Sequence, residues 1–200
     1  MTAADSIPFQ VMDTLETPNP LAYKYLLNQE VIDQGTQSFD SQEKAESFAF
    51  AKAVFALGSV QNVFLKENFV SVTFLPSNEF ELLVEAVPQV VEDELTYYVN
   101  ESVDDGEKNP ILKNLKDIVF STLSDLEKAE VVDAILDDSV RPALARDGGG
   151  LNVLEVEGNV VRIQYQGACG GCPSSQSGTL RAIQNILQGT LKEELVVVTS

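Results

Sequence analysis

The two cysteines of this chain lie close together, in the segment Gly167-Ala168-Cys169-Gly170-Gly171-Cys172-Pro173, and the chain contains no histidine. Two neighbouring thiolates can bind a soft metal or form a redox pair. An iron–sulfur cluster or a Cys₄ zinc site needs four thiolates, so this pair supplies half of such a site. The residue types and their spacing therefore predict a site that two copies of the chain share.

The residues around the two cysteines favour thiolates. Pro173 is typical of the first position of a helix, and a helix N-terminus lowers the pKa of a nearby thiol. Gly170 and Gly171 lack a Cβ, so the turn can wrap closely around a cluster and direct backbone N–H groups at sulfur. We expect an exposed turn that contributes little packing, so that Cys169→Ser or Cys172→Ser removes the site and keeps the fold.

Three other interpretations of the cysteine pair stay open. A thioredoxin-like dithiol also begins a helix, but it needs β-α-β surroundings, and the strands predicted before the motif look like an antiparallel hairpin. A structural zinc site would need carboxylates as its remaining ligands. A buried pair without a ligand would behave as two small apolar side chains, and a Gly-Gly insert is a poor way to build a core. A metal cluster completed by a second chain is favoured over these.

The chain is strongly acidic, with 31 acidic and 13 basic residues and a net charge of −18. Residues 1–125 hold 21 acidic and 7 basic side chains, whereas residues 126–200 hold 10 and 6, and this asymmetry indicates two modules. Such a charge repels nucleic acid and anionic membranes, which we exclude as partners. No apolar run reaches the length of a membrane span.

The first residues, Met1-Thr2-Ala3-Ala4-Asp5-Ser6, have the features of neither a signal peptide nor an arginine-rich transit peptide. They predict a cytoplasmic, reducing location. In such a compartment a close cysteine pair more often binds metal or does chemistry than forms a structural disulfide.

The first module is predicted to have the order β-β-α-β-β-α. Its strands are expected at 9–15, 22–27, 60–66 and 69–75, and its helices at 45–56 and 78–98. Asp40 and Glu43 resemble a capping box for the first helix, and Pro88 should break or restart the second.

The second module is predicted to have the order α-β-β-α-β, with a three-stranded sheet covered by helices. Ser124 and Glu127 form a capping box for its first helix, which Pro142 should kink. Strands are expected at 151–156, 160–165 and 195–198, with a helix that begins at Pro173. The fold class is therefore mixed α/β (α+β) with two small domains, 1–98 and 124–200, joined by a polar linker over 99–123. We expect 124–200 to fold alone.

Two groups of motifs resemble the Nfu/NifU-type iron–sulfur cluster scaffold and carrier proteins. Residues 124–190 look like their C-terminal domain, through Val140-Arg141-Pro142-Ala143-Leu144 with Asp147-Gly148-Gly149, and through Gly167–Ser175 with Thr179-Leu180. Residues 9–98 resemble the Nfu-type N-terminal domain through Asp13-Thr14, Thr17-Pro18-Asn19-Pro20, Lys24-Tyr25 and the hairpin at 60–75.

The resemblance implies a carrier and not an enzyme. It implies a [4Fe–4S] cluster held between two chains by Cys169 and Cys172 of each, so that the loaded form is a homodimer. Upstream cluster assembly proteins would supply the cluster, and apo-proteins would receive it. Arg141 and Asp147-Gly148-Gly149 would serve the fold. From its charge, we interpret the acidic first module either as a docking domain for partners or as an inert solubilising domain. The alternative function is a thiol–disulfide oxidoreductase that uses Cys169 and Cys172, and a third interpretation is a pure interaction module.

Overall fold

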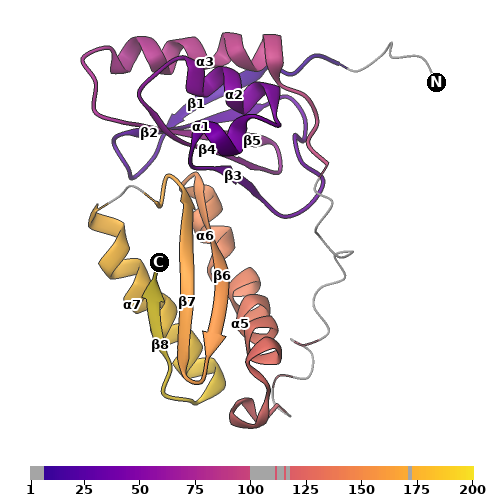
Figure 1. Ribbon diagram of the computed structural model, residues 1–200, viewed down its shortest axis with the longest axis vertical. Helices are drawn as coiled ribbons and strands as arrows, with labels where there is room; N and C mark the ends of the chain where they lie inside the picture. The colour runs from indigo at the N-terminus through magenta and orange to yellow at the C-terminus, as the bar shows by residue number, and fades with distance from the viewer. Residues whose placement is uncertain (1–6, 100–110, 112–114, 116–117, 171–172) are drawn as a thin grey trace, which may run out of the picture. The chain divides into compact units, whose positions relative to one another are not determined.

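The structure of the protein is a computed structural model that describes residues 7–99, 111, 115, 118–170 and 173–200, with the backbone alone at 173–177. The chain divides into two compact units, Met1–Val103 and Asp104–Ser200 (Figure 1). Each unit contains helices and a sheet of its own, so the predicted mixed α/β class is confirmed. The predicted domain bounds at 98/99 and 123/124 stay a prediction.

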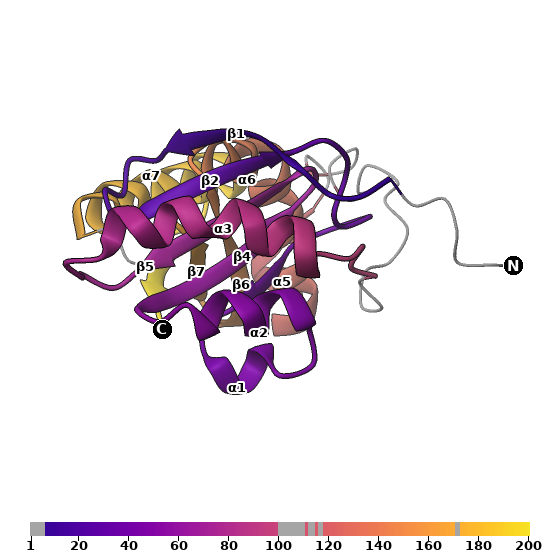
Figure 2. The same cartoon turned by 90° about the horizontal axis from the view of Figure 1, so that it is seen from above.

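The first unit is a five-stranded sheet with helices on one face. Its elements are β1 (Val11–Glu16), β2 (Ala22–Leu27), β3 (Gln37–Phe39), α1 (Gln42–Ala45), α2 (Ala49–Ala56), β4 (Val60–Lys66), β5 (Phe69–Phe74) and α3 (Phe80–Glu94). The strand order is β1-β2-β5-β4-β3, and every neighbouring pair is antiparallel. Figure 2 shows α2 and α3 side by side over this sheet.

The core of the first unit lies between the sheet and these helices. Tyr25 from β2 and Val72 from β5 pack with Val54 from α2 and Val87 from α3, and all four are fully buried. Side chains two residues apart in a strand point to the same face of the sheet, so alternate residues of strands such as β2 and β5 form this core.

The helix predicted over 45–56 is divided in the structure. Ser41, not Asp40, caps the first part, since its hydroxyl accepts a hydrogen bond from the Lys44 N–H at 3.3 Å. Phe48 then takes an extended conformation and its ring stacks on Phe39 with 5.7 Å between centroids. Phe39 belongs to β3, a three-residue strand that the sequence analysis missed. Burial of the aromatic pair therefore overrides the local helical pattern.

The prediction that Pro88 breaks its helix is wrong. Pro88 lies inside α3, which runs without interruption from Phe80 to Glu94. A proline has no N–H to donate to the carbonyl four residues earlier, which here belongs to Val84. The Tyr25 hydroxyl donates to that carbonyl oxygen instead, at 3.1 Å. A side chain from β2 thus satisfies the carbonyl that proline leaves without its helical partner.

The second unit has the predicted element order. Its elements are the 3₁₀ turn η2 (Phe120–Thr122), α5 (Asp125–Ser139), α6 (Arg141–Arg146), β6 (Gly149–Glu157), β7 (Val160–Gly167), α7 (Pro173–Leu191) and β8 (Val196–Thr199). The sheet order is β6-β7-β8, with β6 antiparallel and β8 parallel to the central β7. The helices flank this sheet (Figure 1), and α5 and α7 contribute to the same core.

The predicted capping box at the start of α5 is confirmed. The Ser124 hydroxyl accepts from the Glu127 N–H at 3.4 Å, and the Ser124 N–H donates to Glu127 Oε2 at 2.8 Å. The predicted kink at Pro142 is a break: α5 ends at Ser139, and α6 begins with Pro142 in its first turn.

Part of the segment predicted as a linker contributes to the second core. Phe120 is buried there, and Ile111, Leu115, Ile118 and Leu123 pack against the same cluster. The apolar residues of this segment thus belong to the packing of the second unit, although its polar composition suggested few contacts.

Candidate functional site

Cys169 lies in the turn between the carboxyl end of β7 and the start of α7. Gly167 ends the strand with φ +59°, the Ala168 N–H donates to the Gly148 carbonyl at 3.2 Å, and the Gly170 N–H donates to the Gly167 carbonyl at 3.1 Å. Helix α7 begins at Pro173, as predicted. Cys172 lies outside the described residues. The turn is therefore tied to the end of β7 and to Gly148, the residue before β6.

Cys169 is 8% exposed and belongs to the second core. The expectation of an exposed turn is therefore wrong for this residue. Its neighbour Gly149, which faces Gly167 in the β6–β7 register, explains the burial. A Cβ at Gly149 would overlap the Cys169 sulfur and would lie 2.9 Å from both the Cys169 nitrogen and the Gln166 oxygen. The missing side chain at position 149 is what makes room for the thiol.

The run Asp147-Gly148-Gly149-Gly150 was predicted to be a turn. Gly148 does have φ +75°, which L side chains rarely adopt. The contact between Gly149 and the Cys169 sulfur was missed, because it depends on the strand register. The run of three glycines was the signal available in the sequence.

Tyr165 is a second site residue that the sequence analysis missed. It lies in β7 opposite Leu151, and its hydroxyl oxygen is buried without a hydrogen-bond partner among the described residues. Burial, and secondly the charge of Cys169, raise the pKa of Tyr165 to about 12. The phenol therefore keeps its proton at neutral pH, within electrostatic reach of the thiol.

Arg141 serves the fold, as the sequence analysis inferred. Its guanidinium donates to Asp133 Oδ1 at 2.6 Å, to Asp137 Oδ1 at 2.7 Å and to the Leu151 carbonyl at 3.0 Å. Burial lowers the pKa of Arg141, but the hydrogen bonds and charges of the two aspartates outweigh burial and leave the pKa raised. These contacts join α5 and α6 to β6, the strand that carries Gly149.

The surroundings of the cysteine turn combine two motifs. The β6–β7 hairpin precedes the turn, as predicted. However, β7, α7 and β8 also form a parallel β-α-β unit, which was not expected. The hairpin thus opposes a thioredoxin-like dithiol, whereas the β-α-β unit is compatible with one. Within the described residues, no group of three or more histidine, cysteine, aspartate or glutamate side chains is arranged to hold a metal ion.

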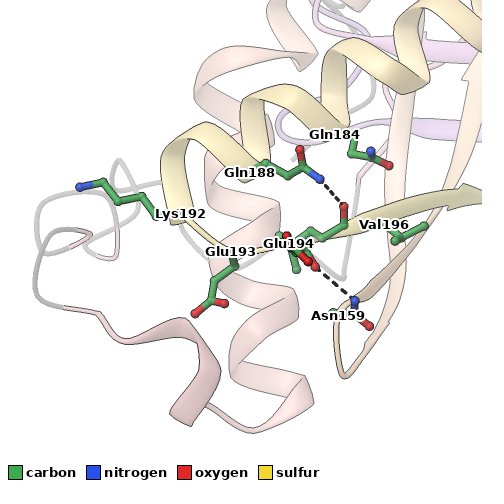
Figure 3. A pocket seen from close by; sticks show the side chains of 8 residues that line it. Asn159, Gln184, Gln188, Lys192, Glu193, Glu194 and Val196 are labelled. Atoms are coloured by element: carbon green, nitrogen blue, oxygen red, sulfur yellow. Dashed lines mark hydrogen bonds between the residues drawn. The ribbon is translucent and has the colours of Figure 1, made fainter.

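An open depression of about 460 Å³ lies elsewhere on the second unit, between the end of α7, the start of β8 and the β6–β7 turn (Figure 3). Its amide side chains already bond to the backbone. Gln188 donates to the Leu195 carbonyl at 2.8 Å, Asn159 donates to the Glu194 carbonyl at 3.2 Å, and Gln184 accepts from the Val197 N–H at 3.1 Å. These residues hold β8 in the sheet, and we assign the depression a structural role.

Two family models match the chain. Residues 132–198 match the NifU-like domain, and residues 12–97 match the N-terminal domain of the scaffold protein Nfu/NifU. Together the two matches cover most of the chain. The chain therefore belongs to the Nfu/NifU family, as the motifs implied.

Curated relatives include proteins named NFU1 iron-sulfur cluster scaffold homolog, mitochondrial. Those of Drosophila persimilis and Drosophila erecta are each 30% identical to this chain, over 185 and 183 residues. The alignments cover 91% of this chain and 62% of each relative, so the chain spans about 62% of their length. A crystal structure of protein SAV1430 from Staphylococcus aureus matches with 20% identity over 42% of this chain and 99% of its own, but the TM-score of 0.37 is too low to support an argument.

The prediction of a cytoplasmic location is wrong. The relatives carry the word mitochondrial in their names and so point to a different compartment. The prediction depended on the composition of residues 1–6, which does not report where the chain works. None of the helices in the described part of the chain has the length and apolar character needed to cross a membrane.

Proposed function

We propose that this chain binds a [4Fe–4S] cluster between two copies of itself, through Cys169 and Cys172 of each copy, and passes the cluster to apo-proteins. The main support is the position of the Cys169 sulfur over Gly149, in the connection between β7 and α7. The second support is the family, whose curated relatives are named iron–sulfur cluster scaffolds. In this proposal the cluster is cargo and the chain is a carrier, not an enzyme.

The number of thiolates supports a shared site. The chain has two cysteines and no histidine, and a cubane cluster takes four thiolates. Two copies supply the full set, with each holding one half. We therefore infer one cluster per dimer when loaded and a mostly monomeric apo-protein.

Transfer is ligand exchange. The thiol of an acceptor protein loses its proton to solvent as its sulfur binds iron, the iron–sulfur bond to a carrier cysteine breaks, and the released thiolate takes up a proton. No electron moves. Because each copy holds only half of the ligands, separation of the copies helps release.

Anaerobic loading of the full chain with iron and sulfide tests the proposal. We expect visible charge-transfer absorption, four irons and four sulfides per two chains, and a dimer by sizing with light scattering. A cluster-loaded monomer would contradict the shared site. Absence of any bound cluster would reject the function.

The alternative is a thiol–disulfide oxidoreductase that uses Cys169 and Cys172. The parallel β7-α7-β8 unit favours it, since such units carry redox dithiols at the start of the helix. The family favours the carrier over this alternative, since both chemistries need access to the buried Cys169 sulfur. Reduction of a model disulfide by the apo-protein, at a rate that falls when either cysteine is replaced, would support this alternative.

We further propose that the first unit docks the partners of the cluster site, through charge. The exposed side of α3 carries Glu81, Glu85 and Glu92. Acidic side chains at such positions speed encounter with a basic face on the partner, and the effect weakens with salt. Replacement of the three glutamates by glutamine in the full chain should slow transfer to a natural acceptor at low salt and flatten the salt dependence.

A matched control removes the same charge from the second unit. Glu130, Asp138 and Glu157 are exposed there, and their amide variants should transfer at the unmodified rate. If both triple variants slow transfer equally, net charge alone is responsible, and the first unit has no docking role.

A further inference from the structure

Tyr165 carries a hydroxyl for which the described part of the second unit offers no partner. Its oxygen is buried and bonds to nothing in the described part of the chain. The buried phenol of the first unit behaves differently, because Tyr25 donates to the Val84 carbonyl at 3.1 Å. Buried polar groups nearly always have partners, so an exception of this kind points to a partner that joins later.

The strand register directs Tyr165 toward the cluster site. Tyr165 faces Leu151, and Gly149 faces Gly167, two positions along the same pair of strands. Residues two apart share a face of the sheet, and diagonal neighbours across an antiparallel pair are about 7–8 Å apart, which an aromatic ring can reach. The Cys169 sulfur occupies the place to which a Cβ of Gly149 would point. The sulfur and the phenol ring therefore lie on one face.

The turn itself brings the chain back over Tyr165. A Cβ built at Gly170 would lie 3.5 Å from the Tyr165 carbonyl oxygen. The effect of the charge of Cys169 on the phenol agrees with this proximity. Since the phenol keeps its proton, it can donate to a sulfur that carries negative charge.

We propose that Tyr165 is a positioning residue for the cargo, whose hydroxyl donates a hydrogen bond to the Cys169 sulfur once that sulfur is bound to iron. This inference rests on the proposed function. A hydrogen bond to an iron-bound thiolate disperses its negative charge, which favours the reduced cluster and slows its loss.

The test compares the loaded full chain with Tyr165→Phe, which removes only the hydroxyl. We expect a more negative reduction potential, higher Fe–S(Cys) stretching frequencies in resonance Raman spectra with a smaller shift in D₂O, and about tenfold faster loss of iron to a chelator. Tyr97→Phe is the matched control, because it removes a phenol that is 49% exposed in the first unit. That variant should equal the unmodified protein in all three measurements.

Each possible result of this test either supports the inference or overturns it. If Tyr165→Phe loads and has the unmodified potential and vibrations, the inference fails while the proposed function stands. If the unmodified chain takes up no cluster, both fail. The apo form of Tyr165→Phe should melt at or above the unmodified temperature, because it loses a hydroxyl that has no partner among the described residues. A clearly lower melting temperature would mean that the hydroxyl already bonds within the fold, and would overturn the inference.

Discussion

The two units of this chain differ in how their strands are connected. All strand pairs of the first sheet are antiparallel, and β4 and β5 are joined by the tight turn at Glu67 and Asn68. The second sheet includes a parallel pair, β7 and β8, which needs a crossover, and α7 supplies it. A crossover brings the carboxyl end of a strand to the beginning of a helix. The cysteine turn occupies that junction, so the candidate site lies where the second sheet departs from antiparallel order.

The largest effect, on cluster binding, is expected from replacement of the cysteines, which only the second unit contains. Cys169→Ala and Cys172→Ala should each abolish cluster binding, measured as iron per chain after loading, because half a ligand set is lost in each copy. Because Cys169 is buried, its replacement by serine should have a second effect, on stability, that its replacement by alanine should not share. Burying a hydroxyl is less favourable than burying the less polar thiol, so Cys169→Ser should also lower the stability of the second unit by chemical denaturation. Equal stability of the Ser variant would contradict this packing.

Phe120 tests where the second unit begins. Its burial predicts that Phe120→Ala destabilises that unit by about 3–5 kcal/mol and leaves the first unit unchanged. Hydrogen exchange, read separately for the two units, measures both effects. For the same reason a fragment that starts at 124 should be much less stable than one that starts at 104. Equal stability of the two fragments would support the predicted linker over 99–123.

Gly149→Ala should disturb the site and the fold together. Its Cβ would overlap the Cys169 sulfur and press on two backbone atoms at 2.9 Å, at a cost of about 1–3 kcal/mol. Cluster loading should fall in parallel. Gly178→Ala is the control, since a Cβ there has no atom within 4 Å and lies in helix α7. It should stabilise the unit by about 0.5–1 kcal/mol with loading unchanged.

The two buried phenols sharpen the comparison between the units. Tyr25→Phe removes the donor to the Val84 carbonyl and should destabilise the first unit by about 1–3 kcal/mol. Tyr165→Phe should cause no loss in the apo-protein. Thermal melting of both variants measures the contrast. Destabilisation by both would mean that the two hydroxyls have the same structural role.

The smallest effect concerns the cap of α5. Ser124→Ala should destabilise the second unit by about 1 kcal/mol at neutral pH. Hydrogen bonds from Ser124, first from its side chain and then from its backbone, lower the pKa of Glu127 below its ordinary value of 4.5. The contribution of Glu127 is therefore fully present above pH 4.5 and is lost as the pH falls through the lowered value. Urea denaturation at several pH values should show the difference between the two proteins constant near pH 7 and smaller in acid.

Features with a local signal could be predicted from the sequence. The Ser124–Glu127 box, the β6–β7 hairpin and the helix that begins at Pro173 each depend on neighbouring residues. The features that were missed depend on contacts between distant parts of the chain. The break at Phe48 follows from its contact with Phe39. No local pattern contains such information.

The same distinction holds for the candidate site, where some features could be predicted from the sequence and others could not. The cysteine pair and its place before a helix could be read directly from the sequence. The position of Gly149 beside the Cys169 sulfur, and that of Tyr165 on the same face of the sheet, could not, because they follow from the register of β6 with β7. A shift of one residue would turn both positions to the opposite face of the sheet.

Because of the contact between Tyr25 and Val84, the residues that evolution can accept at positions 25 and 88 depend on each other. Pro88 removes the N–H that would otherwise reach the Val84 carbonyl, and Tyr25 replaces that donor. A lineage that acquired proline before tyrosine would have passed through a part-buried carbonyl without this donor, whereas the reverse order avoids that intermediate. Phenylalanine at position 25 should accordingly be tolerated where alanine stands at 88 and selected against where proline does.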